Sequence, residues 1–195
     1  MGIKTTTAST TTTTTTTTAG TTKPFEKVEF GPYVDKRWPG VVPEGNHWNV
    51  IGPFRKITVK SRNFGPGHGW SSTRIVQGLI LESFDGAVNS FGMEGHAYPS
   101  GYGELVEELV VPEGQCINEV KLRYGWYADQ IGFVTNKNIL LGPVGGRKGH
   151  TPKEAIKPKG PGRSWCLYSI GGFTVQTESA PALAGLKFVF SPGRF

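Results

Sequence analysis

The chain has 195 residues, which is enough for one ordinary domain and a tail. Its 28 glycines and 14 prolines favour many turns and exclude a fold built from long helices. Only 36% of the residues are hydrophobic, and no run is apolar for long enough to span a bilayer, so we expect no transmembrane segment. The formal net charge of +6 makes anionic partners worth considering.

Residues 1–23 form a separate, threonine-rich unit. An unbroken threonine run has no apolar face to bury, so it cannot offset the entropy of ordering, and we expect an extended tail. Dense threonine is a natural substrate for O-glycosylation, which would stiffen the tail into a stalk. Because threonine is β-branched, the tail could instead lie along the edge of a neighbouring sheet. The expected O-glycosylation sites are Thr10, Thr11, Thr12, Thr13, Thr14, Thr15, Thr16, Thr17 and Thr18.

The rest of the chain divides into an arm and a β domain. Residues 24–50 are rich in proline, glycine and aromatic residues, and we interpret them as a tethered arm or an irregular first strand. From residue 51 to 195, apolar runs of strand length alternate with glycine, proline, asparagine or aspartate. No window keeps a helical period. The run Glu104–Val111 is ambiguous, and Pro112 ends it.

A weak internal repeat links three of these runs. They begin at Leu79, Ile131 and Leu186, and each has a second apolar residue two positions later and a turn sequence soon after. Each also has an apolar partner run upstream, at Ile57–Val59, Val120–Leu122 and Leu167–Val175. Three similar β units would bury one shared core between them. The repeat therefore predicts three sheets around an axis.

Cysteine and histidine residues give no metal site. Cys116 and Cys166 lie in strand-like runs and could form one disulfide if the protein is exported, but two buried free thiols would look the same. Their spacing does not suggest zinc ligands, and neither does that of the four histidines. No signal peptide is visible after Met1. We nevertheless expect a secreted, extracellular protein without a metal or other cofactor.

Catalytic motifs are equally scarce. The chain has no Gly-x-Ser-x-Gly elbow and no phosphate-binding loop. The acidic cluster of Glu104, Glu107 and Glu108 is interpreted as a solvated strand face, not as an acid/base pair. We therefore predict a protein that is not an enzyme.

The stretch from Leu122 to Gly149 is the most informative part of the sequence. A tight Gly125-x-x-x-Asp129 turn separates two strand-like runs, and a glycine-rich turn, Gly142–Gly149, follows the second run. Such a loop can direct one carboxylate, two aromatic rings and several backbone N–H groups at a single point. A carboxylate accepts hydrogen bonds from sugar hydroxyls, and a ring covers the C–H face of a pyranose. A plain hairpin with surface aromatics would have the same spacing.

From about Phe54 to Phe190 the chain resembles the jacalin-related lectins. The resemblance lies in FRKITVKS, in EELVVPEGQCINEVKLRYGWYADQIGFVTN, in the turn LGPVGG, and in IGGF with ALAGLKFVF near the end. It implies an all-β fold, the β-prism I, in which three four-stranded Greek keys are related by pseudo-threefold symmetry. In that family a Gly-x-x-x-Asp loop and a glycine-rich loop form a sugar site. Only the second key keeps this pattern here, because Gln77 and Ala184 replace the acid in the first and third keys.

The resemblance also implies roles at the second-key site. Asp129 would accept from sugar hydroxyls, backbone N–H groups would donate, an aromatic ring would cover the sugar, and the glycines would let the backbone approach it. Such a shallow site binds weakly, so we expect several copies in an oligomer or array. The expected carbohydrate-binding residues are Gly125, Trp126, Tyr127, Ala128, Asp129, Gly145 and Gly146.

A basic segment follows this site, opposed within it only by Glu154. It is either a solvated loop or a patch for an anionic partner such as a sulfated glycan. Aromatic residues do not alternate with these cations, so we do not expect nucleic acid as a partner. The cations are Arg147, Lys148, Lys153, Lys157, Lys159 and Arg163.

Two functions therefore follow from the sequence. The first is an extracellular carbohydrate-binding module that recognises glycoconjugates weakly and multivalently. The second is a structural subunit of an O-glycosylated extracellular fibre or coat, in which the threonine-rich tail mediates assembly into a filament.

Overall fold

The computed structural model describes residues 26–33, 46–63, 74–92, 103–159, 164–176 and 181–193. These ranges contain eleven β-strands. No helix within them is long and apolar enough to cross a membrane. The threonine run and Arg163 lie outside the described residues, so the predictions made for them stay predictions.

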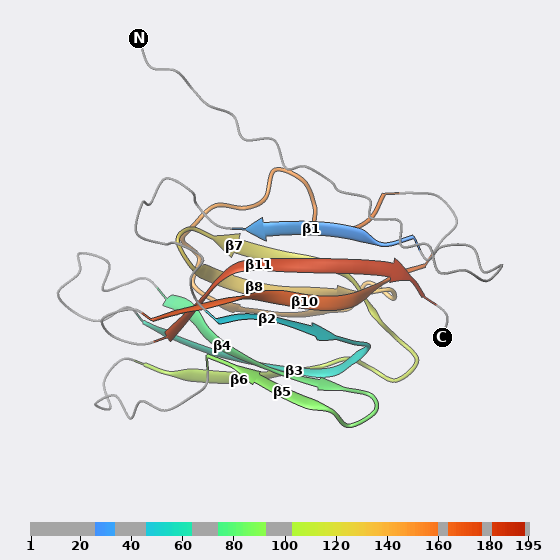
Figure 1. The fold of residues 1–195 in the computed structure, drawn as a ribbon, viewed down its shortest axis with the longest axis horizontal. Coiled ribbons are helices and arrows are strands. Elements are labelled where there is room, and N and C mark those ends of the chain that lie inside the picture. Colours follow the sequence, from blue (N-terminus) through green and yellow to red (C-terminus); the bar gives the residue numbers. More distant parts are fainter. Residues whose placement is uncertain are drawn as a thin grey trace, which may run out of the picture.

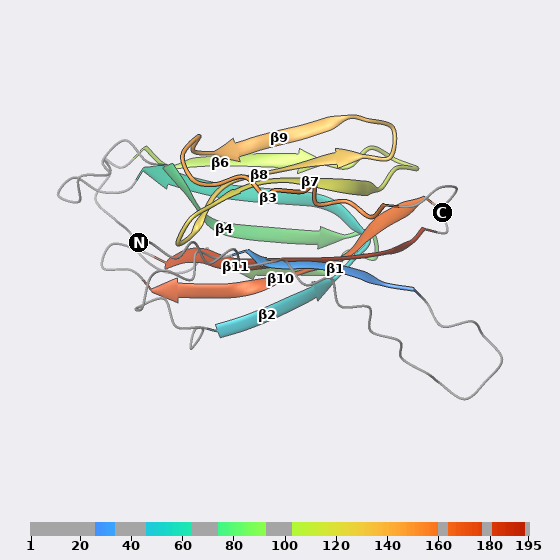
Figure 2. The ribbon, with the colours of Figure 1, turned by 90° about the horizontal axis from the view of Figure 1, so that it is seen from above.

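The strands form three antiparallel sheets (Figures 1 and 2). Sheet A contains, in spatial order, β1 (Val28–Tyr33), β11 (Pro181–Pro192), β10 (Trp165–Gln176) and β2 (Asn46–Ile51). Sheet B contains β5 (Val88–Phe91), β4 (Arg74–Ser83), β3 (Phe54–Asn63) and β6 (Leu105–Val110). Sheet C contains β7 (Ile117–Tyr124), β8 (Ala128–Thr135) and β9 (Leu140–Gly145).

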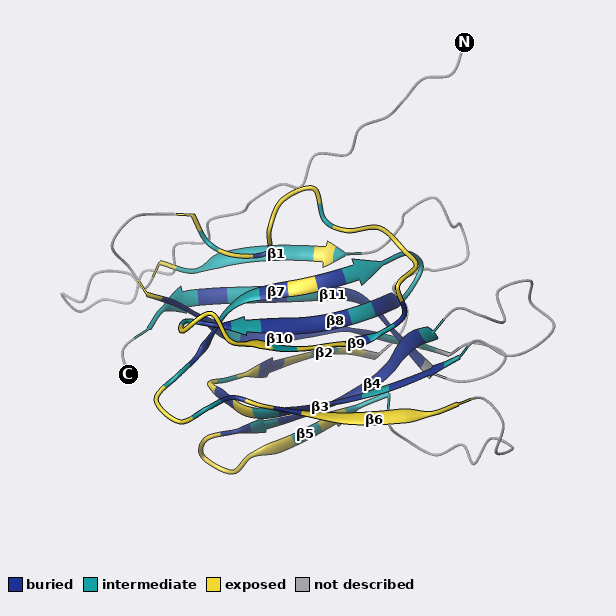
Figure 3. Cartoon of the chain, turned by 180° about the vertical axis from the view of Figure 1, so that it is seen from behind, coloured by how far each residue is buried: buried dark blue, intermediate teal, exposed yellow. Residues whose placement is uncertain are grey.

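The core lies where the three repeated runs meet. They form β4, β8 and β11, which contact one another across the centre of the molecule. Their repeated apolar residues are completely or almost completely buried (Figure 3), and burying each such side chain contributes about 1.5–3 kcal/mol. The three-sheet arrangement predicted from the repeat is therefore confirmed. The residues are Leu79, Leu81, Ile131, Phe133, Leu186 and Phe188.

The upstream partner runs pair with these strands as expected. Ile57 and Val59 of β3 lie opposite Leu81 and Leu79 of β4. Val120 and Leu122 of β7 likewise lie opposite Phe133 and Ile131 of β8, and β10 pairs with β11. Each unit therefore places two strands against the shared core.

Residues 28–33 and 46–51 are part of the prism. They form β1 and β2, which pair with β11 and β10 and complete sheet A. The region interpreted as an arm or an irregular first strand therefore contributes two strands, and the β structure begins before residue 51. The interruption of the β1 ladder between Phe30 and Tyr33 at Gly31 and Pro32 explains why no regular strand period is visible there.

Sheet C departs from the expected four strands. Where a fourth strand would lie, the segment after Gly149 meets β7 only at two isolated bridges, between Tyr124 and His150 and between Val120 and Ile156. Pro152 lies between these bridges and has no N–H to donate to a ladder. The segment therefore follows the edge of β7 without becoming a regular strand.

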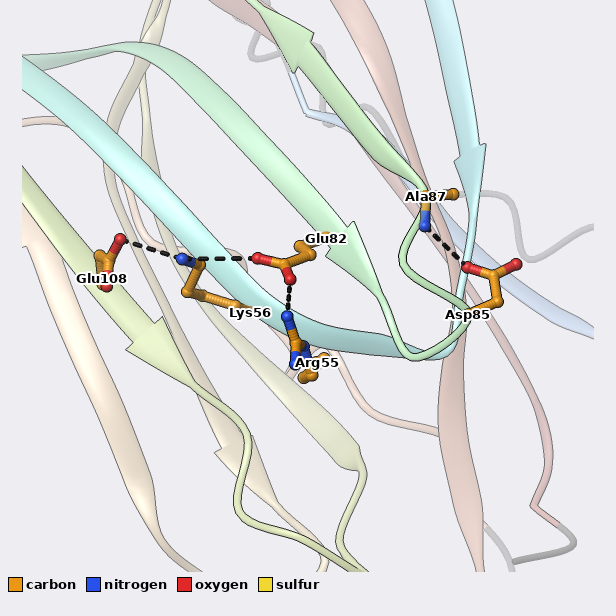
Figure 4. Close-up of polar contacts among 6 residues, drawn as sticks. All are labelled: Arg55, Lys56, Glu82, Asp85, Ala87 and Glu108. Atoms are coloured by element: carbon orange, nitrogen blue, oxygen red, sulfur yellow. Dashed lines mark hydrogen bonds and ion pairs between the residues drawn. The ribbon is translucent and has the colours of Figure 1, made fainter.

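The outer face of sheet B carries a chain of ion pairs (Figure 4). Lys56 Nζ lies 3.4 Å from Glu82 and 3.1 Å from Glu108, and Arg55 contacts Glu82 as well. Lys60 lies 3.0 Å from Glu104 on the same sheet. The acidic cluster is thus found on β6 and at the residue before it, where Glu104, Glu107 and Glu108 are all exposed, and such surface pairs contribute about 0–1 kcal/mol each.

The turn after β4 has its own support. The Asp85 carboxylate accepts a hydrogen bond of 3.0 Å from the backbone N–H of Ala87 (Figure 4). Gly86 between them has a φ of +88°, which favours glycine. The turn that connects β4 to β5 is therefore stabilised by its own local contacts.

One disulfide joins two sheets. Cys116, just before β7 of sheet C, is bonded to Cys166 on β10 of sheet A. Both residues are buried. The two cysteines are 50 residues apart in sequence. The bond therefore closes a long loop and strongly restricts the unfolded chain.

Removing this disulfide should lower the free energy of unfolding by about 4 kcal/mol, because the loop-closure entropy returns to the unfolded state. Urea unfolding of the C116A/C166A double variant, compared with the oxidised wild-type chain, measures the difference. Equal midpoints for the two proteins would contradict this account of the bond.

Candidate functional site

Asp129 occupies a bulge at the start of β8. Arg123 and Tyr124 are neighbours on β7, but they pair with Gln130 and Ala128, so Asp129 is the extra residue between two pairs. A bulge redirects a side chain and interrupts the ladder. The bulge therefore releases the Asp129 side chain from the strict alternation of the strand.

The glycine-rich turn is fastened around Asp129 at two points. The Gly146 N–H donates a 2.7 Å hydrogen bond to the Asp129 main-chain oxygen. Gly149 lies against the side chain, since a Cβ there would be 2.3 Å from Asp129 Oδ2. His150 then exchanges two backbone hydrogen bonds with Tyr124, of 2.9 and 2.7 Å. The two turns expected to form one site are thus brought together.

The Asp129 carboxylate is largely buried. Its residue is 7% exposed, and no described residue donates a hydrogen bond to its side chain. Burial raises the pKa of Asp129 to about 7, while the positive charge of Arg123 acts in the opposite direction. The carboxylate is largely desolvated, and the described residues give it no hydrogen bond, so donors supplied from outside would be favourable here.

Gly125 borders open space beside this carboxylate. A Cβ on Gly125 would meet only one atom within 4 Å, Asp129 Oδ2 at 3.4 Å, and its φ is not in the left-handed region. Neither the packing of the protein nor the backbone conformation therefore requires glycine at this position. The missing side chain leaves an approach to Asp129 from outside.

Gly145 and Gly146 have a packing role within the protein. A Cβ on Gly145 would lie 2.3 Å from the Asp129 main-chain oxygen, and its φ is +116°. A Cβ on Gly146 would lie 2.2 Å from the main-chain oxygen of Arg74 on β4. At both positions the protein's own backbone occupies the space that a side chain would need, so glycine is required for packing.

The residues between Gly125 and Asp129 form the tight turn itself. The Gly125 N–H donates to the Tyr127 main-chain oxygen at 2.9 Å. Trp126 and Tyr127 are half-buried, and burial raises the pKa of Tyr127. Ala128 is buried in β8 and presents no side chain at the opening.

An aromatic layer supports the turn and was missed by the sequence reasoning. The Tyr124 ring lies between Tyr33 of β1, at 5.3 Å between centroids, and His150, at 6.5 Å. Burial raises the pKa of Tyr33 to about 12, with smaller contributions from Tyr124 and Glu154. Tyr33 comes from the region interpreted as an arm or an irregular first strand, and no sequence pattern there indicates its contact with Tyr124.

The equivalent positions in the other two sheets lack an acid. Gln77, Asp129 and Ala184 each precede the first repeated apolar residue of β4, β8 and β11 by two positions. Gly92 lies against the Gln77 main-chain oxygen in the same way as Gly145 lies against that of Asp129. A Cβ added to Gly92 would be 2.2 Å from the Gln77 oxygen, and one added to Gly145 would be 2.3 Å from the Asp129 oxygen. Gln77 is buried and its Oε1 has no hydrogen-bond partner, and Ala184 is buried.

The basic segment is divided by the fold. Arg147 and Lys148 lie in the turn around Asp129, whereas Ile156 pairs with Val120, four residues before Tyr124 on β7 and therefore roughly 13 Å along the strand. The remaining described cations follow His150, and two of them are paired with acids. They are Lys153, Lys157, which lies 3.4 Å from Glu119, and Lys159, which lies 3.0 Å from Glu154.

The acids opposing the segment therefore include one from β7. Glu119 lies close to both Lys121 and Lys157. Burial raises the pKa of Glu119, but its contacts with these two lysines more than offset burial, so the pKa lies below its usual value.

Across the described ranges, no three His, Cys, Asp or Glu side chains gather as a metal site would require.

Comparison with known proteins finds similarity in structure alone. No protein-family model matches the sequence, and no curated protein matches it. Calsepa lectin, solved with a biantennary N-glycan, matches with a TM-score of 0.56 and 15% identity, covering 85% of this chain and 96% of that chain. A mannose-specific jacalin-related lectin from Morus nigra, solved with mannose, matches with a TM-score of 0.53 and 12% identity, covering 90% and 99%.

A third match is a prostate-specific WGA16 glycoprotein lectin, with a TM-score of 0.53 and 15% identity over 77% of this chain and 93% of that chain. Identities this low show the fold and not the ligand. The chain has the β-prism fold of the jacalin-related lectins, which confirms the fold class and the resemblance predicted from the sequence.

The raised pKa of Asp129 should appear in the pH dependence of stability. The folded chain, with a pKa of about 7 against 3.8 without burial, binds the proton more tightly, so the free energy of unfolding should fall as pH rises from about 4 to about 7. Asp129→Asn removes this charge and should stabilise the chain at pH 8 by up to about 4 kcal/mol. Urea unfolding at pH 5, 6, 7 and 8 measures both effects.

The exposed Asp85 offers a matched control, because Asp85→Asn removes an acid that lies outside the core. Its pH profile should follow that of the wild-type chain. An Asp129→Asn profile that also follows the wild type would show that the Asp129 carboxylate is not the titrating group.

Proposed function

We propose that the chain binds carbohydrate at the opening between Gly125 and Asp129. The observation that carries this proposal is a buried carboxylate without an internal donor, next to a glycine whose missing side chain no other atom fills. The β-prism neighbours support it, because two of them were solved with a bound glycan or mannose.

The chemistry of the site suits a pyranose. Two adjacent sugar hydroxyls would donate to the Asp129 carboxylate, each charge-assisted bond contributing roughly 1.5–3 kcal/mol. Either Trp126 or Tyr127 would cover the apolar face of the ring. Gly145, Gly146 and Gly149 hold the carboxylate in place and do not contact the sugar. The chain has one such acid among three equivalent positions, so we propose one site per chain and no catalytic step.

Weak binding at one site makes multivalency useful. A shallow site corresponds to dissociation constants in the millimolar to high micromolar range, or about −4 to −6 kcal/mol. Exposed apolar side chains on β6 and at the start of β9 favour association between copies, which would raise the avidity. These side chains are Leu105, Val106, Val110, Ile139 and Leu140.

The Cys116–Cys166 disulfide supports a secreted protein, because such bonds persist in oxidising compartments. In that setting the threonine-rich tail would carry O-linked sugars and act as a stalk. The same exposed apolar side chains favour the second candidate function, a structural subunit of an extracellular fibre. In a fibre the tail would be needed for assembly, whereas the binding module needs only the prism.

Two glycine variants separate the proposed site from its supporting turn. Gly125→Ala places a methyl group at an ordinary contact distance, so stability should stay unchanged while sugar affinity falls at least tenfold. Gly149→Ala places it 2.3 Å from Asp129 Oδ2 and should destabilise the fold itself. Titration of the full chain with mannose, galactose and glucose by protein-observed NMR measures affinity, and urea unfolding measures stability.

Asp129 supplies the complementary test. Asp129→Asn should remove most of the binding at pH 8, and wild-type affinity should rise from pH 6 to pH 8 as the carboxylate ionises. Sugar binding that survives both Gly125→Ala and Asp129→Asn would place recognition elsewhere. Filaments that depend on residues 1–23, in a chain that binds no sugar, would favour the structural function.

A further inference from the structure

The turn that surrounds Asp129 presents two cations. Arg147 and Lys148 are the residues between Gly146, which is bonded to the Asp129 main chain, and Gly149, which lies against the Asp129 side chain. Both cations are exposed. Because the turn is fixed on each side of them, their backbone position relative to the carboxylate is determined by the fold.

The described acids opposing the basic segment are already paired. Glu154 is paired with Lys159, and Glu119 with Lys121 and Lys157, so these two acids are already compensated. Arg147 forms no ion pair with any described residue. A guanidinium in that state offers a planar pair of donors that matches a carboxylate or sulfate group.

Resting on the carbohydrate site proposed above, we infer that this site selects a sugar bearing an anionic substituent, a sulfate or a carboxylate. Asp129 binds hydroxyls of the ring, and Arg147 binds the anionic group at the rim of the turn. A neutral sugar makes only the first set of contacts and binds more weakly.

The geometry distinguishes this from attraction to a basic surface in general. Lys157 and Lys159 belong to the part of the segment that meets β7 near Val120, and each of them is paired with an acid there. Burial raises the pKa of Asp129 and the positive charge of Arg123 lowers it, so the charge of Arg123 already acts on this carboxylate. Selectivity for an anionic substituent should therefore depend on Arg147 in particular and not on the net charge of the chain.

The test is an NMR titration of the full chain at pH 8 with methyl mannoside, methyl galactoside, their 6-O-sulfates, the corresponding uronic acids, and inorganic sulfate alone. The sulfated or uronic form of the preferred sugar should bind about tenfold more tightly than the neutral form. Arg147→Gln should reduce that ratio to near one. Lys137→Gln removes the same charge from the turn between β8 and β9, at the opposite end of sheet C, and should leave the ratio unchanged.

Comparing the affinity of each neutral sugar with that of its sulfate and of its uronic acid identifies the preferred anion. A higher ratio for the sulfates assigns a sulfate, and a higher ratio for the uronic acids assigns a carboxylate; either result supports the inference. Equal affinity for neutral and anionic sugars overturns it. Equal losses in Arg147→Gln and Lys137→Gln overturn it too, because net charge would then explain the preference.

The proposed function fails in a different way. If no sugar of either kind binds saturably, or if binding is indifferent to Asp129→Asn, the carbohydrate site itself is wrong and the inference falls with it. If neutral sugars bind in an Asp129-dependent way without an anion preference, the carbohydrate site stands and only the role of Arg147 is wrong. Binding of inorganic sulfate that is as tight as that of the sulfated sugar also overturns the inference.

Discussion

The mutual packing of β4, β8 and β11 is the constraint on which the rest of the molecule depends. Each of these strands is covered by its own sheet neighbours at both edges and by the other two middle strands across the centre. Their side chains are therefore buried along nearly the whole length, which is a pattern that accepts apolar residues and penalises charge. The outer strands, the turns and the disulfide all attach to this centre.

Asp129 is notable because it lies at the end of such a strand. Its counterparts are a glutamine and an alanine, so the position does not require an acid for folding. An ionised carboxylate there is costly, as its raised pKa indicates, and no internal donor offsets the cost. Residues that lower stability at a fixed position are typical of sites where function outweighs packing.

Much of the fold could be predicted from the sequence because its signal is local and repeated. The runs at Leu79, Ile131 and Leu186 show the spacing of one β unit, and their burial follows directly. The outer strands β1 and β2 could not be predicted in the same way, because proline, glycine and scattered aromatic residues interrupt the period there. The fourth strand expected in sheet C is likewise interrupted by a proline, Pro152.

The candidate site was only partly predictable. The spacing from Gly125 to Asp129 identifies a turn with one acid, and the glycine-rich turn suggests its partner. Which glycine meets which atom depends on how the turns dock, so the packing roles of Gly145 and Gly146 and the open space at Gly125 required the structure. The basic segment is continuous in sequence, but its pairing along β7 separates Arg147 and Lys148 from the other cations.

The central claim is that the Asp129 carboxylate is held ready for donors that come from a ligand. The most direct measurement is the pKa of Asp129 itself, followed by NMR of a carboxyl-labelled chain with and without a saturating monosaccharide. The account predicts a value near 7 in the free chain and a clear decrease when hydroxyl donors arrive. An Asp129 pKa that is unchanged while the sugar binds would contradict it.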